Sequence, residues 1–290
     1  MSKTLQNLTL KSNFMFGAVM SDPENSKPLL EMVLGFPINK IEVCQERSIV
    51  YHPEYHGVRL DVYAKDDNNT LYNVEMQATR EIDLGKRSRY YHSQLDMELL
   101  TSGTEYAKLP EVFVIFICDF DPFGKNKYCY HLQKCCIEDR DIGIQDGQHT
   151  VYLSTKGKNS SEVVPELINF LNYIGSDLEH SQIPSSDPFV KQLQNAVQKI
   201  KESREMEDRY MLFELMLQDE HKKGMQEQAS QQILDFLSDL GSVPQELSDQ
   251  ILKEQDLNIL KRWIKLSAKV SSIHQFQEEM NKVISNHNTI

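Results

Sequence analysis

A hairpin of two short strands constrains the fold of this chain more than any other feature. Apolar and polar residues alternate over 58–64 and again over 72–77. Such alternation predicts β-strands, because successive side chains of a strand point to opposite faces. The intervening residues 65–69 are rich in Asp and Asn and predict a turn. In this arrangement Asp61 and Glu75 lie on the polar faces of two adjacent strands.

Two carboxylates held side by side indicate a site for a cation. They repel each other unless a proton or a cation lies between them. Hard oxygen ligands without a nearby Cys or His favour Mg²⁺ or Mn²⁺ over zinc. Asp61 and Glu75 therefore suggest metal-assisted hydrolysis of a phosphodiester. The alternative interpretation is the ordinary solvated face of a sheet, on which acidic residues are common.

Several segments of the chain resemble one nuclease family in the same order. Asp61, thirteen intervening residues and then Glu75-Met76-Gln77 resemble the Asp…(Asp/Glu)-x-Lys signature of the PD-(D/E)XK nuclease superfamily, in the branch with Gln in place of Lys. The flanking segments resemble the recombination-promoting nuclease/putative transposase (Rpn) family; they are residues 13–16, 30–35, 85–91 and 106–118.

This resemblance implies a fold, a cofactor and a substrate. The implied fold is α/β, a restriction-endonuclease-like core with a mixed sheet flanked by helices, followed here by an all-α C-terminal extension. The implied cofactor is Mg²⁺, with Mn²⁺ as a substitute, and the implied substrate is DNA. Asp61, Glu75 and the backbone carbonyl of Met76 become the expected metal ligands. Glu31 matches a Glu of the family pattern and is a candidate third carboxylate, with a salt bridge to a neighbouring cation as the alternative.

Gln77 departs from the more common Lys and limits the expected mechanism. A Lys places a positive charge near the attacking water, whereas a neutral amide only orients groups through hydrogen bonds. Either the metal alone activates the water, or a cation from the following helix takes the electrostatic role. That helix supplies the candidates for binding DNA, which are Lys86, Arg87, Arg89 and Gln94.

The net charge of −12 argues against a broadly basic surface that wraps DNA. DNA binding then requires cations concentrated in one groove, and the cluster from Arg80 to Arg89 supplies them. Five cysteines without a CxxC pair predict reduced thiols. No stretch is apolar enough to predict a membrane span, and the expected location is the cytoplasm, bacterial by family resemblance.

The remaining pattern predicts alternating helices and strands. Residues 12–34 predict a helix that Pro23 and Pro28 divide, and 84–101 predict a second helix. The continuous apolar run 112–118 predicts a strand covered on both faces. Residues 41–51 predict a strand pair or one long bent strand. Further strands are expected near 128–132 and 150–153, and a helix over 162–174.

Three regions are expected along the chain. They are a nuclease-like domain over 1–180, a charged helical linker over 181–230 and a small helical unit over 231–290, with Trp263 in the core of that unit. Amphipathic helices in the last region suggest a homo-oligomer.

The functional hypothesis is a Mg²⁺-dependent DNA endonuclease in which Asp61, Glu75 and Gln77 are catalytic. A second hypothesis is a catalytically inactive DNA-binding or oligomeric scaffold with a degenerate nuclease fold, motivated by Gln77, by Asn13 where the related family usually has Asp, and by the acidic net charge. Sequence specificity, the number of metal ions and the biological role in recombination, transposition or defence stay open.

Overall fold

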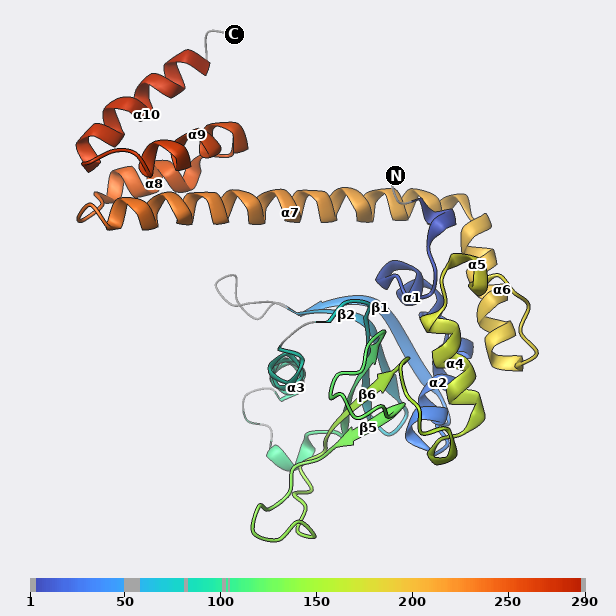
Figure 1. Ribbon diagram of the computed structural model, residues 1–290. Helices are drawn as coiled ribbons and strands as arrows, with labels where there is room; N and C mark the ends of the chain where they lie inside the picture. The colour runs from blue at the N-terminus through green and yellow to red at the C-terminus, as the bar shows by residue number, and fades with distance from the viewer. Residues whose placement is uncertain (1–3, 50–57, 81–82, 101–102, 104, 288–290) are drawn as a thin grey trace. The chain divides into compact units, whose positions relative to one another are not determined.

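The computed structural model describes residues 4–49, 58–80, 83–100, 103 and 105–287. The chain divides into two compact units, Met1–Asp208 and Arg209–Ile290 (Figure 1). The first unit contains the sheet and the second is helical. The mixed α/β core with an all-α C-terminal extension is therefore confirmed.

The first unit is built on a six-stranded mixed sheet with strand order β1-β2-β3-β4-β6-β5. Its strands are β1 (Ile41–Ile49), β2 (Val58–Asp66), β3 (Leu71–Gln77), β4 (Val112–Cys118), β5 (Cys129–Leu132) and β6 (Gln148–Ser154). The β1–β2, β2–β3 and β5–β6 pairs are antiparallel, and β3–β4 and β4–β6 are parallel. A parallel pair needs a crossover connection, which the helix between β3 and β4 provides.

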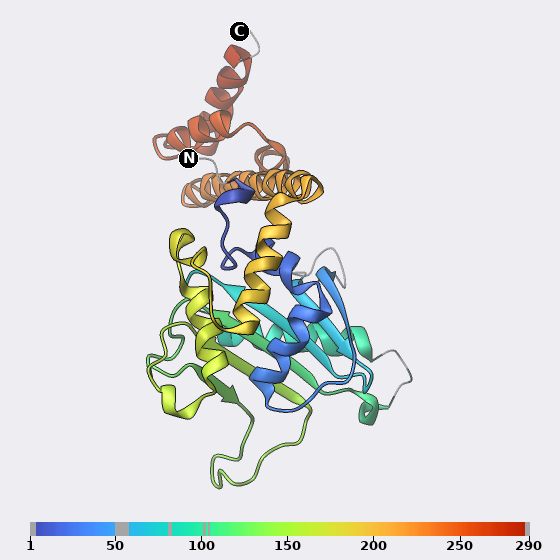
Figure 2. The ribbon, with the colours of Figure 1, turned by 90° about the vertical axis from the view of Figure 1, so that its right-hand side faces the viewer.

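Helices cover both faces of this sheet. Helix α3 (Leu84–Leu99) lies on one face, opposite α1 (Asn13–Met20), α2 (Pro23–Leu34) and α4 (Pro165–Gly175) (Figures 1 and 2). The short helix α5 (Leu178–Ser181) and the longer α6 (Pro188–Glu202) follow α4. The described residues of this unit also form 3₁₀ turns at Leu5–Asn7, Tyr106–Lys108 and Ser160–Glu162. The predicted order of helix, three strands, helix and strand is confirmed.

An apolar core fills the space between α3 and the sheet. It includes Leu84, Tyr91 and Leu95 of α3, together with Val114 and Phe116 of β4. Every residue of β4 except Phe113 is buried, which confirms the expectation that the run 112–118 is covered on both faces.

Prolines and a capping aspartate set the ends of the first two helices. Asp22 accepts a hydrogen bond from the Glu24 amide, and Pro23 occupies the first turn of α2, where a missing N–H is tolerated. The predicted break at Pro23 is thus confirmed. Pro28 lies inside α2 without dividing it, so that part of the prediction is wrong.

The hairpin turn between β2 and β3 is held by one carboxylate. Asp66 Oδ1 accepts hydrogen bonds from the Asn68 and Thr70 amides at 2.9 and 2.8 Å, and Asp66 Oδ2 accepts one from the Tyr72 hydroxyl at 2.9 Å. Asn69 adopts a φ of 66°, a conformation that Asn tolerates better than most residues. These contacts fix the register of the two strands that carry Asp61 and Glu75.

The second unit is a helical bundle that includes most of the long helix α7 (Arg204–Ser238). It continues with α8 (Gln245–Lys253), α9 (Leu257–Ser267) and α10 (Ile273–His287). Trp263 is 1 % exposed and packs in one cluster with Leu237, Ile251 and Phe276. The predicted place of Trp263 in the core of this bundle is confirmed.

The structure divides the expected linker 181–230 between the two units. Helix α6 packs on α1, α2 and α4 and is part of the first unit. Helix α7 is one continuous helix of 35 residues, and the boundary between the units falls near its start. The sequence pattern missed this continuity because the apolar positions of α7 do not form one regular stripe.

Among the described residues, no helix combines the length and the apolar character needed to cross a bilayer. The five cysteines are free thiols in the part of the chain that the structure describes.

Candidate active site

The candidate site lies where strands β2 and β3 separate. Their ladder runs from Lys65 opposite Leu71 to Val62 opposite Val74, and Asp61 and Glu75 follow at its end. Beyond the ladder, side chains replace backbone partners. The Asp61 amide donates a hydrogen bond to Glu75 Oε1 at 3.3 Å, and the Met76 amide donates one to Asp61 Oδ2 at 3.0 Å. The fold therefore brings the two predicted carboxylates together.

Glu75 is buried, and the polar face of β3 is not solvated. All seven residues of β3 are buried, and Glu75 itself is 1 % exposed. The alternation of polar and apolar residues correctly predicted that this face of β3 is polar. It did not predict that the face is buried, because the burial comes from α3, which covers it. The interpretation of Glu75 as an ordinary wet-face residue is therefore wrong.

Burial and a neighbouring charge make Glu75 hard to ionise. Desolvation raises the pKa of Glu75 to about 8, and the negative charge of Asp61 adds to this effect. Arg87 opposes the shift by stabilising the ionised form. In the absence of further positive charge the Glu75 carboxyl group is largely protonated at neutral pH. A cation placed between Asp61 and Glu75 would remove this penalty.

Arg87 is the cation that α3 brings to this site. Its Nε donates a hydrogen bond to the Tyr91 hydroxyl at 2.7 Å, and its Nη1 donates one to Gln77 Oε1 at 3.4 Å. Its Nη2 lies 3.9 Å from Glu75 Oε2. The Tyr91 hydroxyl in turn donates to Glu75 Oε2 at 3.3 Å. Arg87 and Tyr91 are four residues apart on one face of the helix, which lets them act on the same carboxylate.

Asn13 contacts the site from helix α1. Its Nδ2 lies 3.4 Å from Asp61 Oδ1 and 3.3 Å from Asp61 Oδ2 and donates to both. An amide in this position adds a donor to Asp61 without adding negative charge. Asn13 is the first residue of α1, so the start of that helix helps to orient the carboxylate.

The donor atoms at this site fit a hard divalent cation. Asp61 and Glu75 provide carboxylate oxygens, which Mg²⁺ and Mn²⁺ prefer. The Gln77 carbonyl accepts a hydrogen bond from the Asp119 amide on the β4 side. Backbone groups alternate along a strand, so the Met76 carbonyl faces the β2 side, where the Met76 amide meets Asp61. No cluster of three or more Asp, Glu, His or Cys side chains with metal-binding geometry occurs among the described residues. The two carboxylates and a backbone carbonyl are thus the set available.

Replacing Glu75 by glutamine tests, in metal-free protein, whether the fold disfavours the ionised form of Glu75. Between pH 4.5 and about 8 the unfolded chain releases the Glu75 proton while the folded protein retains it. The contribution of Glu75 to the free energy of unfolding of the wild type therefore falls as the pH rises through that range. We expect Glu75→Gln to be more stable than the wild type at pH 8, by on the order of a few kcal/mol, and similar to it near pH 4.5.

Urea denaturation in EDTA at both pH values measures the difference. Glu42→Gln, which alters an exposed carboxylate of β1, is the matched control and should show no such gain. If the free energy of unfolding of the Glu75→Gln variant depends on pH as that of the wild type does, the raised pKa assigned to Glu75 is contradicted.

Four other predicted site residues lie apart from the two carboxylates. Lys86 is exposed and pairs with Asp83 at 3.1 Å. Arg89 is also exposed and lines a cavity with Ser88 and His92 on another side of α3. Gln94 is only 6 % exposed, which leaves it little surface for DNA.

Glu31, the fourth, is engaged elsewhere. Its Oε1 accepts a hydrogen bond from the Ile38 amide at 2.8 Å and lies 3.9 Å from Lys27 Nζ. The structure therefore does not place Glu31 with Asp61 and Glu75, and the salt bridge that the sequence left open is the contact observed.

Sequence reasoning missed Asn13 and Tyr91 as members of the site. The four-residue spacing of Arg87 and Tyr91 is a usable signal once α3 is known to cover the polar face of β3. The contact between Asn13 and Asp61 joins residues 48 positions apart, and no local pattern predicts it.

Comparison with known proteins supports a nuclease relationship. Residues 10–240 match a family model described as PD-(D/E)XK nuclease family transposase. Neither the curated proteins nor the solved structures that were compared with the chain include a match.

Proposed function

Because this chain belongs to the PD-(D/E)XK nuclease family of transposases, we propose that it is a Mg²⁺-dependent endonuclease that hydrolyses phosphodiester bonds of DNA. The observation that carries the proposal is the pairing of Asp61 with the buried Glu75 at the end of the β2–β3 ladder. Titratable groups with strongly shifted pKa values are concentrated at functional sites.

In this proposal Asp61, Glu75 and the Met76 carbonyl hold the cation, and Glu31 and Gln94 have no part. When bound, Mg²⁺ supplies Lewis acidity that makes a water molecule more acidic and offsets negative charge on the phosphate. Asn13 and the Met76 amide orient Asp61 through their hydrogen bonds. Groups that orient a ligand in this way raise metal affinity by roughly 10–100-fold.

Arg87 takes the electrostatic role that a lysine has in other branches of the superfamily. Tyr91 and Gln77 hold its guanidinium beside Glu75, so it is already oriented when the substrate binds. A fixed cation stabilises charge that develops on the phosphate without reorganisation. Gln77 orients the attacking water or the phosphate by hydrogen bonding. The exposed Lys86 and Arg89 contact the DNA backbone on either side.

A plasmid assay tests the proposal directly. We expect purified full-length protein to convert supercoiled plasmid into nicked and linear forms in Mg²⁺ or Mn²⁺. EDTA should abolish the reaction, because the bound cation supplies the Lewis acidity on which the proposed hydrolysis depends. If the protein retards DNA in a gel in a salt-sensitive way but yields no cleavage products with any divalent metal, the inactive scaffold is favoured instead.

Self-association and location complete the proposed function. Helix α7 exposes Met211, Leu212, Leu215 and Met216, which supports a homo-oligomer formed through the C-terminal helices. Family membership supports action on DNA in the bacterial cytoplasm.

A further inference from the structure

A second polar cavity lies in the first unit, apart from the two carboxylates. It has a volume of about 400 Å³ and is formed by the N-terminal segment, the end of α4, the region of α5 and one side of α6. Its lining includes two lysines and several hydroxyl and amide groups, among them Thr9, Tyr173, Gln182, Asn195, Lys191 and Lys201. None of the lining residues is an Asp or a Glu. The cavity therefore presents hydrogen-bond donors and positive charge without an internal counter-ion.

Lys201 is a half-buried cation that this cavity does not neutralise. Burial lowers the pKa of Lys201, and no neighbouring charge contributes to the shift. Lys201 forms no ion pair with any of the described residues. The nearest acidic residue in sequence, Glu202, accepts a hydrogen bond from Gln198 at 2.7 Å. An anion bound beside this ammonium group would stabilise its charged form.

Tyr173 adds an unused donor to the same cavity. The residue is 8 % exposed, and its hydroxyl has no hydrogen-bond partner among the described residues. Burial raises the pKa of Tyr173 to about 12, so the hydroxyl keeps its proton at neutral pH. Tyr173 lines the cavity, where its hydroxyl can donate a hydrogen bond to a bound acceptor.

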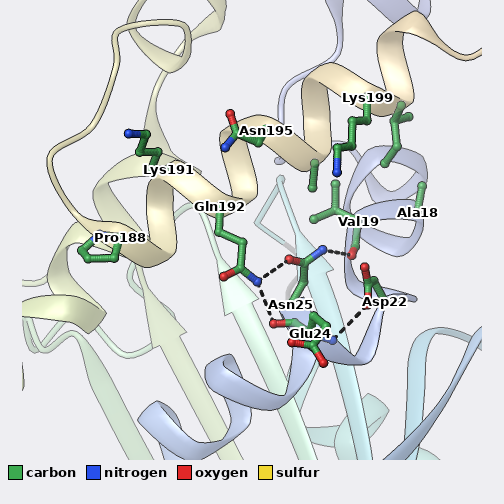
Figure 3. A pocket seen from close by; sticks show the side chains of 12 residues that line it. Ala18, Val19, Asp22, Glu24, Asn25, Pro188, Lys191, Gln192, Asn195 and Lys199 are labelled. Atoms are coloured by element: carbon green, nitrogen blue, oxygen red, sulfur yellow. Dashed lines mark hydrogen bonds between the residues drawn. The ribbon is translucent and has the colours of Figure 1, made fainter.

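A neighbouring cavity along α6 shares Lys191 and Asn195 with this one but differs in charge. Its lining includes Asp22 and Glu24, and Gln192 donates hydrogen bonds to the Glu24 carbonyl and to Asn25 (Figure 3). Lys199 extends toward Val19 and Asp22 in that view, whereas Lys191 points away from Asn25 (Figure 3). The carboxylates make that cavity a poor site for an anion. Lys199 also provides a control lysine from the same helix.

We propose that the cavity lined by Tyr173, Lys191 and Lys201 is a binding site for a phosphate group. Two ammonium groups, a phenol and amide donors match the several acceptor oxygens and the negative charge of phosphate. The phosphate has two possible sources, a small phosphorylated molecule or the backbone of DNA bound at the nuclease site. The second source rests on the proposed function, and the first does not.

Thermal unfolding of the full-length chain tests the small-molecule source. We expect inorganic phosphate, compared with chloride of equal ionic strength and in EDTA, to raise the Tm of the sheet-containing unit by a few degrees. Lys201→Gln should lose this response, and Tyr173→Phe should reduce it. Lys199→Gln should respond as the wild type does. Circular dichroism of each variant checks that the fold is retained.

Salt-dependent binding of a labelled DNA duplex in EDTA tests the backbone source. A duplex phosphate in the cavity would make the slope of log K against log salt shallower by about 1 in the Lys191→Gln/Lys201→Gln double variant. A rise in Tm with phosphate that Lys201→Gln loses supports the site with a small phosphorylated molecule as the source. A shallower salt slope in the double variant supports the site with the DNA backbone as the source. If Lys201→Gln keeps the full phosphate response and the double variant keeps the wild-type slope, the site is refuted. A wild-type chain that binds no DNA would refute the nuclease proposal, while the thermal experiment still tests the cavity.

Discussion

Replacing Asp61 by asparagine is expected to lower the rate of plasmid cleavage by at least about 10³-fold. A bound cation contributes several kcal/mol to the stabilisation of a phosphoryl transition state, and each 1.36 kcal/mol corresponds to about tenfold in rate. The amide side chain of this variant keeps a carbonyl oxygen that can accept the Met76 amide, so the local backbone geometry should persist. The loss would therefore report the missing charge and not a disrupted strand. Initial rates of nicking at saturating Mg²⁺ measure the effect.

Asp67→Asn is the matched control for this experiment. Asp67 is an exposed carboxylate in the turn of the same hairpin and lies outside the site. We expect its variant to cleave within about twofold of the wild type, since isolated surface changes have small effects. Unchanged cleavage by the Asp61→Asn variant would exclude Asp61 as a ligand and remove the basis of the proposed function.

Replacing Arg87 by alanine is expected to reduce kcat/KM by about 10²–10³-fold, the loss typical for one preorganised electrostatic donor. The substitution removes the contacts to Tyr91, Gln77 and Glu75 together. It also removes the positive charge that lowers the pKa of Glu75, so metal binding should weaken at neutral pH. The activity of the variant should therefore recover in part as the pH is raised. Arg87→Lys should restore some activity, because it returns the charge but not the forked geometry.

Lys86→Ala separates this role from general attraction of DNA. Lys86 is adjacent in sequence but exposed, and it pairs with Asp83. We expect its variant to bind DNA more weakly at low salt and to keep a nearly normal rate at saturating DNA, because Lys86 contributes attraction to the DNA backbone, which salt screens, and no contact to Glu75. Equal losses of rate for the Arg87 and Lys86 variants would contradict the distinct role assigned to Arg87.

The sequence was sufficient for most elements of the sheet-containing unit. Alternation over 58–64 and 72–77, and the apolar run 112–118, predicted β2, β3 and β4 because the period of a buried strand is visible locally. The break before Pro23 followed from backbone chemistry. The long helix α7 did not follow, since its mixed polar surface lacks a single apolar stripe.

The site was predictable only in part, for a physical reason. Asp61 and Glu75 were identified because they lie in one hairpin whose register the turn at Asp66 fixes. The burial of Glu75 depends on α3, the crossover helix between the parallel strands β3 and β4, which covers the polar face of β3. The choice of Arg87 over Lys86 and Arg89 depends on which side of α3 faces Glu75. Tertiary packing sets that orientation, and local residue patterns do not.

The central claim is that Asp61 and Glu75 jointly bind a divalent cation, and Mn²⁺ binding measured by electron paramagnetic resonance tests it most directly. We predict that the wild-type protein removes the signal of free Mn²⁺ at pH 8 and that Asp61→Asn and Glu75→Gln each abolish this binding, whereas Asp67→Asn does not. Binding of equal affinity by the wild type and both site variants, or no binding by the wild type at that pH, would contradict the claim.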